Sequence, residues 1–132
     1  MKKAAAALLC AALLLTAACS SQAFEFDEDA AVSAAKDVID LVYVLDFDAI
    51  YGLFREDVRE LVTAESLEAA IAPIMDQSGA FVEHKKAQAV AHNDKQFGEI
   101  IIVGVQTKYE NETLTYTISF DRDFNLVGLY IQ

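Results

Sequence analysis

The sequence predicts an α+β domain, in which N-terminal helices pack on one face of a curved antiparallel sheet of about four strands. Two observations predict this class. Over residues 30–78, apolar side chains recur every three or four positions, which is the period of a helix that buries one face. After Gly79 the period becomes two, the period of strands whose side chains alternate between core and solvent.

The chain opens with the parts of a secretory signal. Lys2 and Lys3 precede an apolar run over residues 4–18, and small residues end the run. At about 15 residues it is shorter than the roughly 20 that a membrane-spanning helix needs. We therefore predict a lipoprotein signal peptide over residues 1–18.

Cys19 is the predicted site of lipid attachment. The segment Leu-Thr-Ala-Ala-Cys at residues 15–19 resembles a lipobox, where a bacterial lipoprotein precursor is lipidated on its cysteine and then cut before it. Ala17 and Ala18 leave the backbone open to the peptidase, although Thr16 stands where leucine is usual. The alternative is an ordinary signal peptide cut at an A-x-A-like site, with Cys19 incidental.

Cleavage before Cys19 leaves 114 residues, which suffice for one domain with a modest core. With 8 basic and 21 acidic side chains, this mature chain carries a net charge of −13 and is a poor match for nucleic acid or anionic headgroups. Membrane attachment therefore relies on two or more acyl chains.

We expect an exported, lipid-anchored envelope protein. If the cell has two membranes we expect it in the outer one, because the residue after Cys19 is Ser20 and not the aspartate that retains lipoproteins in the inner membrane. Residues 19–29 read as an acidic tether, and residues 30–132 as the domain.

Three helical segments follow the tether. Residues 30–45 are amphipathic, Asp48 is suited to begin a short helix through Phe54, and residues 56–61 add a further turn. Thr63 is the expected N-cap of a longer helix, which Gly79 ends. Pro73 should kink or shorten this helix, because its ring clashes with the preceding turn.

The strands are expected in the second half of the chain. In residues 113–120 four apolar residues alternate strictly with threonine or serine, which is the clearest strand pattern. Residues 99–109 and 126–131 read as two more strands, and residues 81–91 as a weaker one. Turn-forming residues occupy the connections, among them Asp121, Asp123 and Asn125. Consecutive antiparallel strands with short turns predict a meander.

The motifs that resemble binding sites are incomplete. The series Asp121, Asp123, Asn125 begins like a calcium loop, but a leucine follows where that loop needs glycine. His84 and His92 would lie roughly 26 Å apart on one regular strand, so they cannot share a metal ion unless the strand is broken, and neither has a cysteine nearby. The sequence thus predicts no metal site, no cofactor and no catalytic residue that a motif identifies.

Over residues 30–132 the chain resembles the nuclear transport factor 2-like superfamily. The resemblance rests on the hydrophobic order of AKDVIDLVYVLDFDAIYGLF at residues 35–54, on SGAF at 78–81 and on FDRDFNLVGLY at 120–130. It is closest to a bacterial branch of secreted and lipid-anchored domains of unknown function. It implies a cystatin-like cone, a curved sheet around helices that often encloses a pocket. Some members are enzymes, such as ketosteroid isomerase and scytalone dehydratase; others bind ligands or dimerise. No catalytic motif matches, so no catalytic role is carried over.

Three functions follow from these observations. The leading one is a non-catalytic envelope domain that binds an unknown small molecule or a protein partner. The alternatives are a pocket enzyme of the isomerase or dehydratase kind and a structural dimerisation module. A pocket is predicted between the first helix and the concave sheet face near Tyr43, Tyr51 and Tyr116, which have apolar rings and hydroxyl tips. The alternative at this place is a filled core.

The outer face of the sheet is the predicted interface. Residues 100–103 and 126–131 are apolar on both faces, and a contiguous apolar patch on an exported domain usually marks an interface. A homodimer or an envelope protein should cover it, unless Phe24 and Phe26 do so. The expected members are Ile100, Ile102, Thr115, Thr117, Leu126 and Tyr130.

Overall fold

The computed structural model describes residues 23–132, so the predicted signal peptide and Cys19 lie outside the described residues. Helices on the N-terminal side precede a four-stranded antiparallel sheet, which confirms the predicted α+β class. The elements are α2 (Glu28–Tyr43), α3 (Phe47–Leu53), α4 (Glu56–Arg59), α5 (Ala64–Ser78), β1 (Phe81–Asp94), β2 (Gly98–Tyr109), β3 (Thr113–Asp121) and β4 (Leu126–Ile131).

Aspartate side chains begin the first two helices. The carboxylate of Asp27 accepts a hydrogen bond of 3.0 Å from the backbone N–H of Ala30, so α2 begins two residues before the predicted start. Asp46 caps α3 in the same way through the N–H of Ala49, at 3.1 Å. The residue that starts α3 is thus Asp46, not the predicted Asp48, which lies in the first turn.

The helix α5 begins with a capping box. The Thr63 hydroxyl accepts from the N–H of Ser66, and the Ser66 hydroxyl accepts from the N–H of Thr63, both at 3.0 Å. The helix runs through Pro73 to Ser78, so of the predicted kink or shortening the shortening is wrong. Ile71 and Met75, one on each side of Pro73, are buried, and this packing holds the helix across the missing hydrogen bond.

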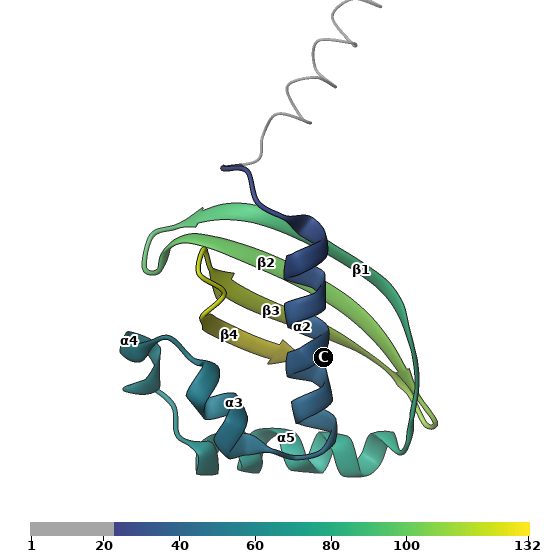
Figure 1. The fold of residues 1–132 in the computed structure, drawn as a ribbon. Coiled ribbons are helices and arrows are strands. Elements are labelled where there is room, and N and C mark those ends of the chain that lie inside the picture. Colours follow the sequence, from purple (N-terminus) through teal and green to yellow (C-terminus); the bar gives the residue numbers. More distant parts are fainter. Residues whose placement is uncertain (1–22) are drawn as a thin grey trace, which may run out of the picture.

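The strands form a meander in the order β1-β2-β3-β4, and the sheet curves around α2 (Figure 1). Register shifts interrupt the ladders between Phe81 and Glu83 and between His84 and Lys86 in β1, and between Ser119 and Phe120 beside β4. Such bulges add local twist and bend. β1 is therefore a long, irregular edge strand.

The core fills the space between the helices and the concave face of the sheet. The helix α2 contributes the small residues Ala31 and Ala35, which let its backbone approach the strands closely. Every helix and strand of the described domain contributes at least one residue to the core cluster. The fully buried side chains from α2 and the strands include Val38, Ile39, Val42, Ile101, Val103, Val105, Tyr116 and Ile118.

The segment before α2 packs on the domain. Phe24 and Phe26 are half-buried against the core, and their ring centroids lie 6.2 Å apart. The guanidinium of Arg122, in the turn between β3 and β4, lies 4.6 Å over the Phe24 ring and donates to the carbonyl of Glu25 at 3.4 Å. The described part of the predicted tether therefore packs against the end of the sheet that carries the β3–β4 turn.

Candidate functional site

The concave side of the sheet is closed by a pair of tyrosines. The hydroxyls of Tyr109 and Tyr116 lie 2.6 Å apart, and Tyr116 is fully buried. The Tyr116 hydroxyl also donates to the sulfur of Met75 on α5, at 3.9 Å. Burial raises the pKa of Tyr116 above its ordinary value, so the hydroxyl stays protonated. Tyr116 thus has its hydrogen bonds inside the core and does not present them to an open pocket.

The other two predicted pocket tyrosines lie apart from each other. The Tyr43 ring stacks on Tyr109 at a centroid distance of 6.1 Å, and its hydroxyl accepts from the N–H of Phe81 at 3.2 Å. The Tyr51 hydroxyl donates to the carbonyl of Arg59 at 3.4 Å. The structure therefore brings Tyr43 and Tyr116 together through Tyr109, while Tyr51 bonds to the last residue of α4.

The described residues offer little acid–base chemistry in the interior. Among residues 23–132, the buried polar residues are Ser78 and Thr107, and neither is an acid or a base at neutral pH. Groups of three or more His, Cys, Asp or Glu side chains placed to hold a metal ion do not occur in this part of the chain. Across the same residues, every helix is too short or too polar to cross a membrane.

The outer face of the sheet is open and carries polar side chains in two rows across the strands. Each row joins residues that are opposite one another in the antiparallel ladders. The first row is Gln88, Gly104, Thr117 and Tyr130, from β1 to β4, and the second is Lys86, Gln106 and Thr115, from β1 to β3.

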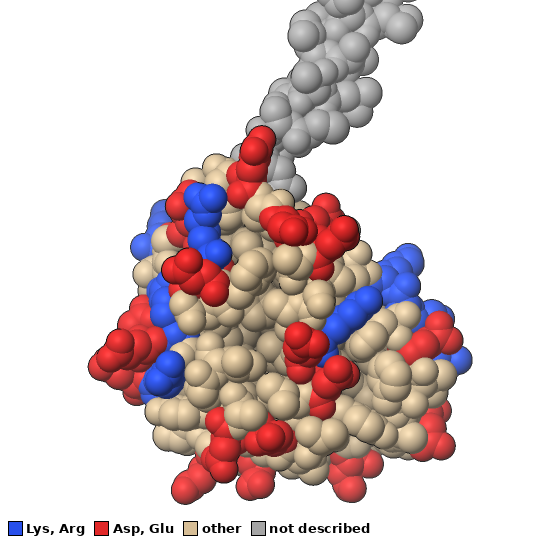
Figure 2. Space-filling model, in the orientation of Figure 1, with Lys and Arg blue, Asp and Glu red and all other residues tan. Residues whose placement is uncertain are grey.

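Charge is distributed unevenly between the two layers. Residues 23–80 hold 14 acidic and 3 basic side chains, a net charge of −11. The β1–β2 hairpin, residues 81–109, holds 3 acidic and 4 basic side chains, a net charge of +1. Figure 2 shows the many acidic side chains on the face that carries the helices. The hairpin is thus the least acidic surface of a strongly acidic chain.

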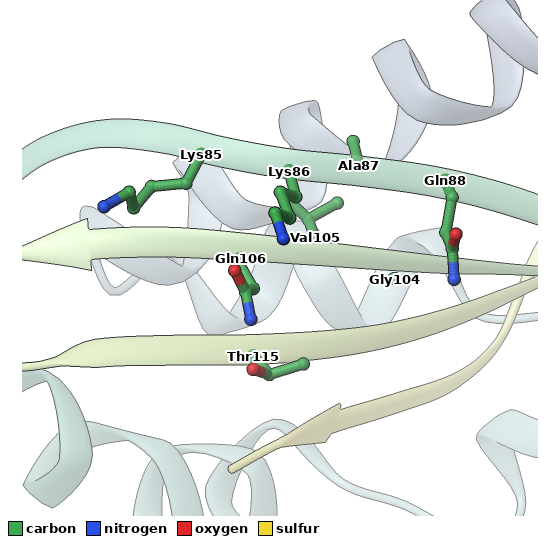
Figure 3. Close-up of a pocket in the computed structure, with 8 residues that line it drawn as sticks. All are labelled: Lys85, Lys86, Ala87, Gln88, Gly104, Val105, Gln106 and Thr115. Atoms are coloured by element: carbon green, nitrogen blue, oxygen red, sulfur yellow. The ribbon is translucent and has the colours of Figure 1, made fainter.

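A shallow, open hollow of about 700 Å³ lies on the outer face over β1, β2 and β3. Gly104 forms part of its floor because it has no side chain, and a Cβ built there would meet no atom within 4 Å. Figure 3 shows the polar ends around it on one side of the sheet, with the helices behind. The polar side chains that line it are Lys85, Lys86, Gln88, Gln106 and Thr115.

Four of the six predicted interface residues lie on this outer face. Ile102 and Thr115 are half-buried, and Thr117 and Tyr130 are exposed. Leu126 is fully buried and faces the core opposite Phe120. The register shift at this point places Leu126 and Tyr130 on opposite faces, although they are four positions apart in one strand. Leu126 is therefore not part of the outer surface.

Ile100 is also covered, with 5% of its surface exposed. Its partner across the ladder is Asp121, whose carboxylate lies 3.9 Å from the guanidinium of Arg55. Arg55 also donates to the carbonyl of Phe97 at 3.2 Å. These contacts gather the β1–β2 turn and the segment after α3 at this end of the sheet. The open part of the outer face therefore begins at Ile102.

The hollow was not among the predicted sites, but the sequence contains its signal. Gly104 interrupts an apolar run in β2, and a glycine inside a strand often marks a place where another molecule approaches the backbone. Lys86 and Gln88 alternate with small alanines in β1, which places both polar side chains on one face. What the sequence alone does not provide is the register that sets these residues beside Gly104.

The fold and this surface define an α+β domain with a filled concave side and a hollowed outer sheet face. The chain belongs to the family described as protein of unknown function (DUF3887), whose model matches residues 35–129. It is also similar to a solved NMR structure of a protein from Ruminococcus gnavus ATCC 29149, with 25% identity and a TM-score of 0.69 over 80% of this chain and 90% of that one. Among curated proteins none matches.

Proposed function

We propose that this chain is a lipid-anchored domain of the cell envelope that binds a ligand or a protein partner without catalysing a reaction. The observation that carries the proposal is the hollow over Gly104, which combines an open floor with convergent polar groups. The concave face is instead filled by apolar side chains and by the Tyr109–Tyr116 pair. We therefore assign binding to the outer face of the sheet.

One argument from the sequence supports the location, and one from the structure supports the wider family. The signal over residues 1–18 and the cysteine that follows it support export and lipid anchoring, in the outer membrane if the cell has two. The curved sheet around α2 supports our proposal that the chain is part of the nuclear transport factor 2-like superfamily.

Sedimentation with purified cell envelopes tests the binding function. The chain from Ser20 to Gln132 lacks the lipid site and contains the whole described core. We expect it to co-sediment with envelopes, and the variant Gly104→Thr to lose this, because a side chain at this position occupies the floor of the hollow and its Cβ meets no atom within 4 Å. Gly52→Ala, in the exposed part of α3, is the matched control and should bind as the wild type does. Absent sedimentation, or sedimentation that Gly104→Thr leaves intact, contradicts the proposal.

A second copy of the chain is a second candidate occupant of the same face. Val90 is 44% exposed and lies opposite Ile102 on the outer face, and Tyr130 is 62% exposed. Exposed apolar side chains on one face favour an interface between proteins. This observation supports a structural dimerisation module.

A further inference from the structure

We propose that the hollow over Gly104 binds an anionic polysaccharide, a sugar chain that carries acidic groups. This inference rests on the proposed function and gives its ligand a chemical class. Lys85 and Lys86 contact the acidic groups, the amides and hydroxyls beside them contact sugar hydroxyls, and the ring of Tyr130 packs against a sugar ring. Each part of this assignment follows from a separate feature of the outer face.

The charge of the hollow selects an anion. Lys85 and Lys86 are exposed, and among residues 23–132 neither takes part in an ion pair. No carboxylate occurs in the two rows of side chains that cross the hollow. The acidic layer of helices repels an anion from the opposite side of the molecule. An acidic ligand is therefore directed to the two free ammonium groups.

The neutral groups of the hollow match hydroxyl groups. Gln88 and Gln106 each present an amide that both donates and accepts, and Thr115 and Thr117 present hydroxyls that do the same. Within the described residues, none of these four side chains forms a hydrogen bond with the protein. A sugar hydroxyl also donates and accepts, so a sugar chain can satisfy all four groups. A simple inorganic anion would leave most of them without a partner.

Tyr130 extends the surface beyond the hollow. It lies in one row with Thr117 and Gly104, and 62% of its surface is exposed. Neighbouring strands are about 4.8 Å apart, so the row from Gln88 to Tyr130 spans roughly 14 Å. An exposed aromatic ring at the end of a polar row offers an apolar face to the C–H side of a sugar ring. The length of the row suits a polymer rather than a single sugar.

The position of the hollow favours a polysaccharide over an acidic peptide. Extended peptides commonly bind at the edge of a sheet, where their backbone completes the ladder of hydrogen bonds. Here the hollow lies on the outer face over β1, β2 and β3, and the backbones of β2 and β3 are paired on both sides. A ligand above β2 and β3 meets side chains only. A peptide would have no partners there for its backbone N–H groups beyond those side chains.

The test measures amide chemical shifts of the ¹⁵N-labelled chain from Ser20 to Gln132 during titration with defined polymers. The probes are oligogalacturonate, neutral maltooligosaccharide of the same length and poly-L-glutamate. We expect oligogalacturonate alone to shift the amides of Gln88, Gly104 and Thr117, with affinity that falls as salt rises. The double variant Lys85→Gln/Lys86→Gln should weaken binding at least about tenfold, a loss near 1.4 kcal/mol. Lys95→Gln, in the β1–β2 turn, is the control for charge and should leave the affinity unchanged.

The remaining outcomes separate the inference from the proposed function. Equal binding of poly-L-glutamate or of the neutral polymer at these amides overturns the inference and leaves an outer-face binding module. Binding of oligogalacturonate elsewhere, or of no polymer, overturns it as well. In that case the proposed function still stands if the wild type sediments with envelopes and Gly104→Thr does not. Circular dichroism of each variant, with an unchanged midpoint of thermal unfolding, shows that the fold is intact.

Discussion

The hydroxyl oxygens of Tyr109 on β2 and Tyr116 on β3 lie 2.6 Å apart, and each residue has at most 1% of its surface exposed. Each hydroxyl is thus the main polar partner of the other. This pair replaces the open pocket that the sequence suggested, because it satisfies the polar groups of the concave face from within. We therefore propose that ligand binding takes place on the opposite, outer face of the sheet.

Tyr116→Phe should destabilise the domain by about 1–3 kcal/mol, since it leaves the buried Tyr109 hydroxyl without a partner. The double variant Tyr109→Phe/Tyr116→Phe removes both hydroxyls and should cost less than the sum of the two single variants. Urea denaturation of the four proteins measures this coupling. Additive losses would show that the two hydroxyls do not depend on each other.

Thr63→Ala should lower the free energy of unfolding by about 0.5–2 kcal/mol, because it removes the side-chain acceptor of the α5 capping box. Ser33→Ala, at an exposed position within α2, is the matched control, and alanine there favours the helix slightly. Chemical denaturation of both variants makes the comparison. An equal effect of the two substitutions would contradict the role of the cap.

The domain should become less stable as the pH is lowered, because His84 takes up a proton more readily in the unfolded chain. This side chain is half-buried against Phe81, and a ring nitrogen lies 2.9 Å from the hydroxyl of Thr107. Burial lowers the pKa of His84, nearby Lys36 lowers it further, and Asp40 opposes both. The unfolded chain therefore binds this proton more readily than the folded one, so the stabilisation is complete above the ordinary pKa of about 6.5 and is lost below it.

His84→Gln should accordingly flatten the change in unfolding free energy between pH 7.5 and 5.5, measured by urea denaturation. His92→Gln, at an exposed position of β1, serves as the control and should keep the slope of the wild type. If both variants retain that slope, groups other than His84 cause the pH dependence.

Light scattering of the chain from Ser20 to Gln132 tests self-association through the outer face. If two copies pair there, the wild type should be dimeric at high micromolar concentration, and Ile102→Lys should be monomeric because it places a charge beside the exposed Val90 on this face. Leu61→Lys, which alters an exposed apolar side chain outside the sheet, is the control. A monomeric wild type would leave the face to a foreign ligand or partner.

Cys19→Ala should move the protein from the detergent phase to the aqueous phase on extraction of cells, because the acyl chains would have no attachment point. Cys10→Ala, within the predicted signal, is the control and should leave partitioning unchanged. Continued partition of Cys19→Ala with the membranes would contradict the lipid anchor.

The sequence predicted most of the fold because its periods are clear. The alternation in residues 113–120 and the threonine cap at residue 63 depend on neighbours close in sequence, and both are found in the structure. The error at Pro73 has a different origin, since tertiary packing of Ile71 and Met75 overrides a local preference.

The candidate site was harder to predict because it depends on register. A register shift of one residue between β3 and β4 places the side chain of Leu126 in the core. The local pattern of residues 126–131 does not predict this shift. The hollow likewise exists only because Gly104 is opposite Gln88 on one side and Thr117 on the other. Such cross-strand neighbours are far apart in the chain.

The irregular register of β1 has a consequence for copies held close together on a surface. An edge strand of 14 residues would, if flat, offer its backbone to the same strand of a neighbouring molecule. The shifts beside Glu83 and Lys86 break the even spacing of backbone groups along this edge, and the adjacent lysines add mutual repulsion. The strand that supplies the lysines of the hollow thereby also disfavours edge-to-edge pairing between copies of the domain.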